Sequence, residues 1–230
     1  MSGVQNQMYH HQYHQCRNGT DQAWGGNRAR PVLVKKFFPN GNVPNLESYA
    51  TAEAAGDDRA LFCGVNRTLD NEDVSTFKSG FGVAKFTNFK TDGSAGHDAT
   101  FPDADFFLMR AAEAYLNFAE ADARLNGGET TAEGTAAINA IRKRANASTR
   151  EDKGYTLSDI CDEWSREFYF EGRRRMDLIR FNRYGGNVNY NWQWKGGTKE
   201  GRNFSKDLNI FAIPTNELTS NKNLTQNPGY

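Results

Sequence analysis

Three glutamates recur at intervals of four residues within the stretch 156–182, at Glu163, Glu167 and Glu171. On a helix this spacing places their carboxylates on one side, where they repel one another. Neighbouring carboxylates can perform acid–base chemistry when their environments separate their pKa values. The alternative is a structural clamp, in which cations neutralise the carboxylates and no proton reaches a substrate. Structural ion-pair networks also perturb pKa values, and the sequence favours this second interpretation.

The clamp requires arginines, because a carboxylate beside apolar rings must be either paired or protonated. Glu167 and Glu171 share their side of the helix with Trp164 and Phe168. Arg175 lies four residues after Glu171 and can serve it within the same helix. Other cations must come from the preceding helices. The predicted charge network therefore consists of Arg110, Arg142, Arg144, Glu167, Glu171 and Arg175.

A single long helix over residues 156–182 would position these carboxylates. Thr156 can cap its first turn together with Asp159, and Gly185-Gly186 follows its end. Apolar residues at helical spacing predict one buried stripe. The stripe consists of Leu157, Ile160, Trp164, Phe168 and Leu178.

A helical hairpin is predicted before this helix. Residues 103–126 follow Pro102, are apolar on two sides, and precede Gly127-Gly128. The sequence 130–133 predicts a capping box for a second helix that runs to about residue 145. The short connection requires antiparallel packing, and the pair has about the size of one 34-residue tetratricopeptide repeat. A helix with two apolar sides needs neighbours on both, and the chain offers few clear ones.

The remaining sequence is rich in turns and loops. Short strands or extended segments are predicted at 32–38, 82–86 and 210–214, the last of them buried. The predicted fold is therefore mainly α, a tetratricopeptide-like hairpin and a long helix with extensive irregular loops and a few short strands. We divide the chain into an irregular region, 1–101, and a helical region, 102–230.

Composition excludes several classes of function. The 28 basic and 28 acidic residues give zero net charge, which argues against general binding of nucleic acids or anionic membranes. No run of about 18 apolar residues is present, so no membrane span is predicted. His10 and His14 are four residues apart, but no third ligand accompanies them. We predict no metal and no cofactor, and no Ser/His/Asp arrangement or phosphate-binding loop is evident.

Aromatic residues in the loops are the candidates for ligand binding. Trp192 and Trp194 alternate with Asn191 and Gln193, a pattern that suits sugars because rings stack on C–H faces while amides bond to hydroxyls. A hairpin that packs one tryptophan inward is an equally good interpretation. Trp24 could likewise fill the core from its loop. The predicted ligand-binding residues are Trp24, Trp192, Trp194, Tyr13 and Asn191.

Three stretches together resemble the SusD/RagB family of outer-membrane nutrient-binding lipoproteins. They are RAAEAYL with AEA and INAIRKRA within 110–145, FEG with R…DLIR within 170–180, and IP with the terminal QNPGY within 213–230. The resemblance covers residues 102–230 well and 32–101 loosely. Trp164 departs from it, since the family usually has an arginine after Glu163. These motifs are structural, so no ligand-binding residue transfers from the family.

The resemblance implies a non-catalytic protein on the cell surface of Bacteroidota. Family members carry a lipid anchor on an N-terminal cysteine and pair with a SusC-type TonB-dependent transporter of the outer membrane. They capture oligosaccharides, and sometimes other nutrients, for polysaccharide utilisation. The chain resembles the carboxy-terminal part of such a protein. Two alternatives are a helical-repeat interaction scaffold and a glycoside hydrolase, which would need two carboxylates flanking a cleft.

Overall fold

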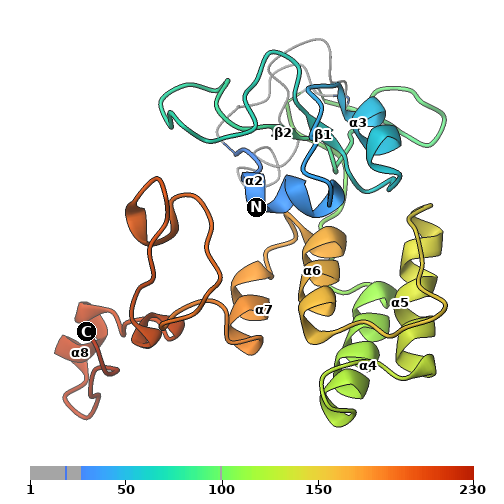
Figure 1. Ribbon diagram of the computed structural model, residues 1–230. Helices are drawn as coiled ribbons and strands as arrows, with labels where there is room; N and C mark the ends of the chain where they lie inside the picture. The colour runs from blue at the N-terminus through green and yellow to red at the C-terminus, as the bar shows by residue number, and fades with distance from the viewer. Residues whose placement is uncertain (1–18, 20–26, 99) are drawn as a thin grey trace. The chain divides into compact units, whose positions relative to one another are not determined.

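The computed structural model describes residues 19, 27–98 and 100–230 of the chain (Figure 1). Contacts divide the chain into a first unit that ends at Gly172 and a second unit, Arg173–Tyr230. This boundary differs from the one placed at residues 101 and 102 from the sequence. The described residues form seven α-helices, three short 3-10 helices and two very short strands, so the chain is mainly α as predicted.

Most of the secondary structure lies in the first unit. Its described elements are α2 (Pro31–Val34), η1 (Lys35–Phe37), α3 (Ser48–Ala55), β1 (Phe62–Cys63), β2 (Gly82–Val83), α4 (Ala111–Leu125), α5 (Ala132–Arg144) and α6 (Leu157–Phe168). The second unit contains α7 (Arg174–Arg180), η2 (Lys195–Gly197), η3 (Lys206–Asn209) and α8 (Thr215–Ser220). The two strands pair antiparallel, with Phe62 opposite Val83.

The predicted extended segments have mixed outcomes. The prediction of a strand over 32–38 was wrong, because this segment forms most of α2 and all of η1. Pro31 is the first residue of α2, and its ring fixes the backbone in a conformation that suits a first helical turn. The strand over 82–86 is confirmed at its first two residues. The segment 210–214 forms no strand and is not buried, since Ile210 is 57% and Phe211 71% exposed.

Aromatic rings form the core of the loop-rich part of the first unit. The Phe62 ring centroid lies 5.5 Å from that of Phe37 and 5.2 Å from that of Tyr169. The Tyr169 hydroxyl donates to the backbone carbonyl of Arg59 at 2.6 Å. Since Tyr169 directly follows α6, this core anchors the carboxyl end of that helix.

Helices α4 and α5 form the predicted hairpin, and α4 packs against α6 (Figure 1). The prediction of a capping box at 130–133 was wrong. The N-cap residue is Thr131, and its side chain makes no capping hydrogen bond to the helix. Instead, the Asp122 carboxylate accepts the Thr131 backbone N–H at 2.7 Å and its hydroxyl at 3.0 Å. A residue of α4 thus secures the start of α5.

Helix α4 is shorter than predicted and buries only one of its two apolar sides. It begins after Arg110, whose backbone is extended. Leu116, Ala119 and Ala123 are fully buried, and Ala112 nearly so. The other side remains exposed among the described residues, and its large members are Tyr115, Phe118 and Leu125, exposed by 47%, 53% and 86%.

The single helix predicted over 156–182 was also wrong. The capping box of Thr156 and Asp159 starts α6 as expected, but the helix ends at Phe168. Tyr169 is extended, and Phe170 and Gly172 adopt the left-handed region with φ of +61° and +76°. Turns of this kind end helices, and here the turn lets Tyr169 enter the aromatic core. Glu171 therefore lies in a turn rather than on a helix.

Candidate functional site

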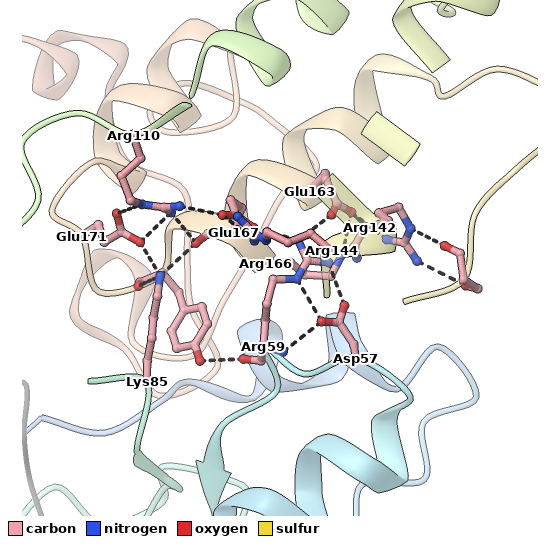
Figure 2. A network of polar contacts seen from close by, with 12 residues as sticks. Asp57, Arg59, Lys85, Arg110, Arg142, Arg144, Glu163, Arg166, Glu167 and Glu171 are labelled. Atoms are coloured by element: carbon pink, nitrogen blue, oxygen red, sulfur yellow. Dashed lines mark hydrogen bonds and ion pairs between the residues drawn. The ribbon is translucent and has the colours of Figure 1, made fainter. Parts of the chain in front are cut away.

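The carboxylate of Glu163 lies fully buried among three arginines (Figure 2). Its oxygens are 2.8 Å from Arg59 Nη1, 2.7 Å from Arg142 Nη1 and 2.8 Å from Arg166 Nη2. Burial alone would raise the pKa of Glu163, but the charges of Arg166, Arg59 and Arg142 outweigh burial and lower it to about 2. Glu163 is therefore ionised at neutral pH.

Glu167, one turn further along α6, also contacts three arginines. Its carboxylate accepts from Arg59 Nη1 at 3.0 Å, Arg110 Nη1 at 2.7 Å and Arg144 Nη2 at 2.6 Å. Burial opposes ionisation, but the hydrogen bonds from Arg144 and Arg110 hold the pKa of Glu167 below its usual value. Arg59 thus bridges two successive carboxylates of one helix face.

Glu171 completes the row from its position in the turn (Figure 2). Arg110 binds it in a bidentate manner, with Nε and Nη2 each 2.8 Å from a carboxylate oxygen. Lys85 pairs with the same carboxylate and donates to the carbonyls of Glu167 at 2.8 Å and Tyr169 at 3.0 Å. Burial lowers the pKa of Lys85 to about 8, against the opposing effect of Glu171.

These side chains form what we call the α6 charge network. It consists of Asp57, Arg59, Lys85, Arg110, Arg142, Arg144, Glu163, Arg166, Glu167 and Glu171 (Figure 2). The predicted partners Arg110, Arg142 and Arg144 all donate to carboxylates of α6. Arg175 was predicted wrongly, because the helix ends before Glu171 and Arg175 instead donates to the carbonyls of Leu208 and Asn209.

Sequence reasoning missed three of the cations. Arg59 and Lys85 come from the loop-rich region, where no periodic pattern ties them to α6. Arg166 lies four residues after Asp162 on the helix, but it binds Glu163, and Lys36 pairs with Asp162. The sequence signal for these additional cations was the number of carboxylates on α6, which exceeded the number of arginines that helical spacing could place beside them.

The electrostatics of this network fit a clamp rather than acid–base chemistry. A general acid needs a carboxyl whose pKa is raised toward neutrality. The pKa values of Glu163 and Glu167 are instead lowered, and each carboxylate is enclosed by donors. The network therefore joins the loop-rich region, α5 and α6 by charge.

Acid is expected to destabilise the first unit. The lowered pKa means that Glu163 contributes stability above pH 4.5, its unfolded value, and loses that contribution as the pH falls toward 2. A shift of this size corresponds to about 3 kcal/mol. Urea unfolding at pH 7, 5, 4, 3 and 2 measures the effect. A free energy of unfolding that stayed constant from pH 5 to 2 would contradict it, and Glu163→Gln is the control because it removes this titration.

Trp192, one of the predicted ligand-binding residues, packs against two tyrosines of the second unit. The Trp192 ring lies 6.2 Å from Tyr184 in a stacked arrangement and 6.2 Å from Tyr190 edge to face. The buried Lys195 ammonium lies 4.7 Å from the Trp192 ring centroid. Trp192 is nevertheless half-buried rather than buried, so the residue is partly accessible to solvent.

Two further predicted residues belong to the same loop. Trp194 is half-buried and adopts a left-handed backbone with φ of +66°, a conformation that is unusual for a bulky residue. Asn191 is exposed, and its amide donates to the carbonyls of Glu200 and Gly201 at 3.0 Å each, which closes the loop. The other predicted ligand-binding residues, Trp24 and Tyr13, lie outside the described residues, as do His10 and His14.

Two structural observations concern other kinds of site. Among the described residues, no three or more His, Cys, Asp and Glu side chains gather in a way that could hold a metal ion. No helix in that part of the chain has the length and apolar character needed to cross a membrane.

Comparison with known proteins identifies relatives along most of the chain. The starch-binding protein SusD of Bacteroides thetaiotaomicron is 38% identical over 245 residues, which cover 93% of this chain and 43% of that protein. The chain thus spans less than half the length of this curated relative.

Solved structures share the fold at lower identity. A laminarin-binding SusD-like protein is 22% identical with a TM-score of 0.57, over 99% of this chain and 44% of that one. A SusD-like protein from Bacteroides fragilis is 20% identical with a TM-score of 0.59, over 90% and 48% of the two chains. The model of the SusD family matches residues 51–230. Because this match covers more than half of the chain, the chain belongs to the SusD/RagB family.

Proposed function

We propose that the protein is a non-catalytic binding protein that captures oligosaccharides for import through a SusC-type TonB-dependent transporter. The observation that carries this proposal is the 38% identity to a protein named for binding starch. The lowered pKa values of Glu163 and Glu167 support the non-catalytic part, since neither carboxyl can donate a proton at neutral pH.

The place of action and the partner belong to the same proposal. Family membership supports a lipid-anchored protein exposed at the outer membrane, beside the transporter that receives the captured sugar.

The proposed ligand-binding residues remain Trp192, Trp194 and Asn191, with Trp24 and Tyr13. The partial solvent accessibility of Trp192 supports stacking, because a ring held by Tyr184 and Tyr190 loses little freedom when a sugar binds. Asn191 holds the loop closed through two backbone carbonyls, which supports a positioning role rather than a direct contact.

Oligosaccharide binding by the intact protein is expected to quench its tryptophan fluorescence. Trp192→Ala should weaken binding about two- to thirteenfold, since one stacking contact contributes about 0.5–1.5 kcal/mol. Starch, mannan and xylan oligosaccharides are the probes, and Trp24→Ala tests the second predicted ring. Phe211→Ala is the matched control, because Phe211 is an exposed ring of the same unit outside the loop. The proposal would be refuted if the fluorescence of the intact protein responded to none of the glycans. Normal melting curves show that each variant is folded.

One feature favours the alternative of an interaction scaffold. A shallow groove of about 460 Å³ lies on the outer side of the hairpin, lined by Ala114, Tyr115, Phe118, Glu133, Ala136 and Ala137. Exposed apolar surfaces of this kind mark sites of protein contact. Tight binding to the transporter in the absence of any sugar binding would favour the scaffold.

A further inference from the structure

The neutral total charge of the chain conceals an uneven distribution. Residues 173–230 contain ten Lys and Arg but only four Asp and Glu, a net charge of +6, and residues 1–172 carry the compensating −6. The second unit is therefore strongly basic for its 58 residues. A surplus of one sign favours a partner of the other sign.

The arginines of the two units have partly different partners. In the first unit, Arg59, Arg110 and Arg142 donate to carboxylates. In the second unit, Arg173 and Arg180 pair with the Asp177 carboxylate at 3.5 and 3.0 Å, but other arginines of this unit have carbonyl partners. Arg175 donates to two carbonyls at 3.0 and 3.1 Å, and Arg202 to the carbonyl of Gly196 at 3.0 Å. Because a carbonyl oxygen carries no formal negative charge, these hydrogen bonds do not neutralise the positive charges of Arg175 and Arg202.

Arg183 places a positive charge beside Tyr190, one of the rings that pack against Trp192. Its guanidinium carbon lies 5.2 Å from the ring centroid of Tyr190, and no carboxylate contacts its side chain in the described structure. Arg174 approaches the same tyrosine, 5.9 Å from the ring and with Nη2 2.7 Å from the hydroxyl. The Tyr190 ring in turn lies 6.2 Å from Trp192.

These residues make up what we call the basic aromatic cluster: Arg174, Arg183, Tyr184, Tyr190, Trp192 and Lys195. All are half-buried except Lys195, which is buried and fixes the loop by donating to the Tyr190 carbonyl at 2.6 Å and to Asn203 Oδ1 at 3.0 Å. Cationic groups and ring surfaces thus lie side by side within one unit, held by a lysine and partly open to solvent.

We propose that the basic aromatic cluster binds an oligosaccharide that bears carboxylate groups, such as a chain of uronic acid units. Rings stack against the C–H face of a sugar, and a guanidinium binds a carboxylate through two parallel hydrogen bonds. A neutral sugar has no carboxylate that could pair with the guanidinium group of Arg183. This inference rests on the proposed function and specifies the class of glycan.

The test compares two oligosaccharides of equal length with the intact protein. Calorimetry measures the binding of an oligogalacturonate and of a maltooligosaccharide at 50 and 300 mM NaCl. We expect the acidic chain to bind at least tenfold more tightly at low salt, and its affinity to fall at high salt because salt screens exposed charges. The affinity for the neutral chain should be independent of salt.

Three variants assign the effect to the cluster. Arg183→Gln should weaken binding of the acidic chain about five- to tenfold, whereas Arg183→Lys should retain most of the salt dependence. Lys222→Gln is the matched control, because it removes the same charge from an exposed position of the same unit. Equal effects of Arg183→Gln and Lys222→Gln would overturn the assignment, and melting curves show whether each variant is folded.

The outcomes separate this inference from the proposed function. Equal or tighter binding of the neutral chain would overturn the acidic ligand and leave oligosaccharide capture standing. Failure of both chains and of the neutral mannan and xylan probes would refute both proposals. Binding to vesicles that contain anionic lipid, without binding of either chain, would assign the cluster to a membrane surface and overturn the inference.

Discussion

Glu163→Gln is expected to lower the free energy of unfolding by about 3–5 kcal/mol, the range observed when one member of a buried ion pair is removed. The substitution retains the size of the side chain but removes the negative charge. Arg59, Arg142 and Arg166 would then face one another without the carboxylate that neutralises them. Because Glu163 is fully buried, water cannot replace it. Urea unfolding at pH 7 measures the change.

An exposed glutamate provides the control for this measurement. Glu151→Gln makes the same chemical change at the surface, where Glu151 accepts only a hydroxyl at 3.1 Å, and should change stability by less than about 0.5 kcal/mol. If Glu163→Gln cost no more than Glu151→Gln, the α6 charge network would not contribute to stability. The role of a clamp would then be refuted.

Trp164→Ala is the other substitution with a large expected effect, about 3–5 kcal/mol of lost stability. The side chain is fully buried, and its ring lies 5.2 Å from that of Phe168. Its Nε1 donates to Glu120 Oε2 at 3.0 Å, so truncation removes both packing and a partner of a buried carboxylate. Thermal and urea unfolding together measure the loss.

Trp164→Phe separates these two contributions. The phenyl ring keeps most of the packing and removes the hydrogen bond, so we expect a loss of about 1–3 kcal/mol. Arg124, which pairs with Glu120 at 2.9 Å, is unchanged in this variant and can still neutralise that carboxylate. A phenylalanine variant as unstable as the alanine variant would show that the hydrogen bond, and not the filled volume, dominates.

Trp164 also illustrates how one departure from a family pattern is accommodated. The resemblance to the family implies an arginine at this position, and the indole N–H provides one donor in its place. That donor serves Glu120 of α4, whereas Arg59, Arg142 and Arg166 serve the neighbouring Glu163. The buried carboxylates are thus paired without an arginine at position 164.

The sequence by itself determined the local features of this protein. Periodic apolar residues predicted α4, α5 and α6, and the capping box of Thr156 and Asp159 fixed the start of α6. Such features depend on residues within one or two turns of each other, so spacing alone is sufficient. The need for arginines near Glu167 and Glu171 followed from the same spacing.

Tertiary structure decided where α6 ends and which cations serve it. Nothing within 156–182 required a break after Phe168, but burial of Tyr169 against Phe37 and Phe62 draws the chain out of the helix. Arg59 and Lys85 reach α6 across 104 and 82 positions of sequence. Any cation that folding brings near can neutralise a buried carboxylate. The sequence therefore predicts that the carboxylate needs a partner, but only the tertiary structure determines which residue that partner is.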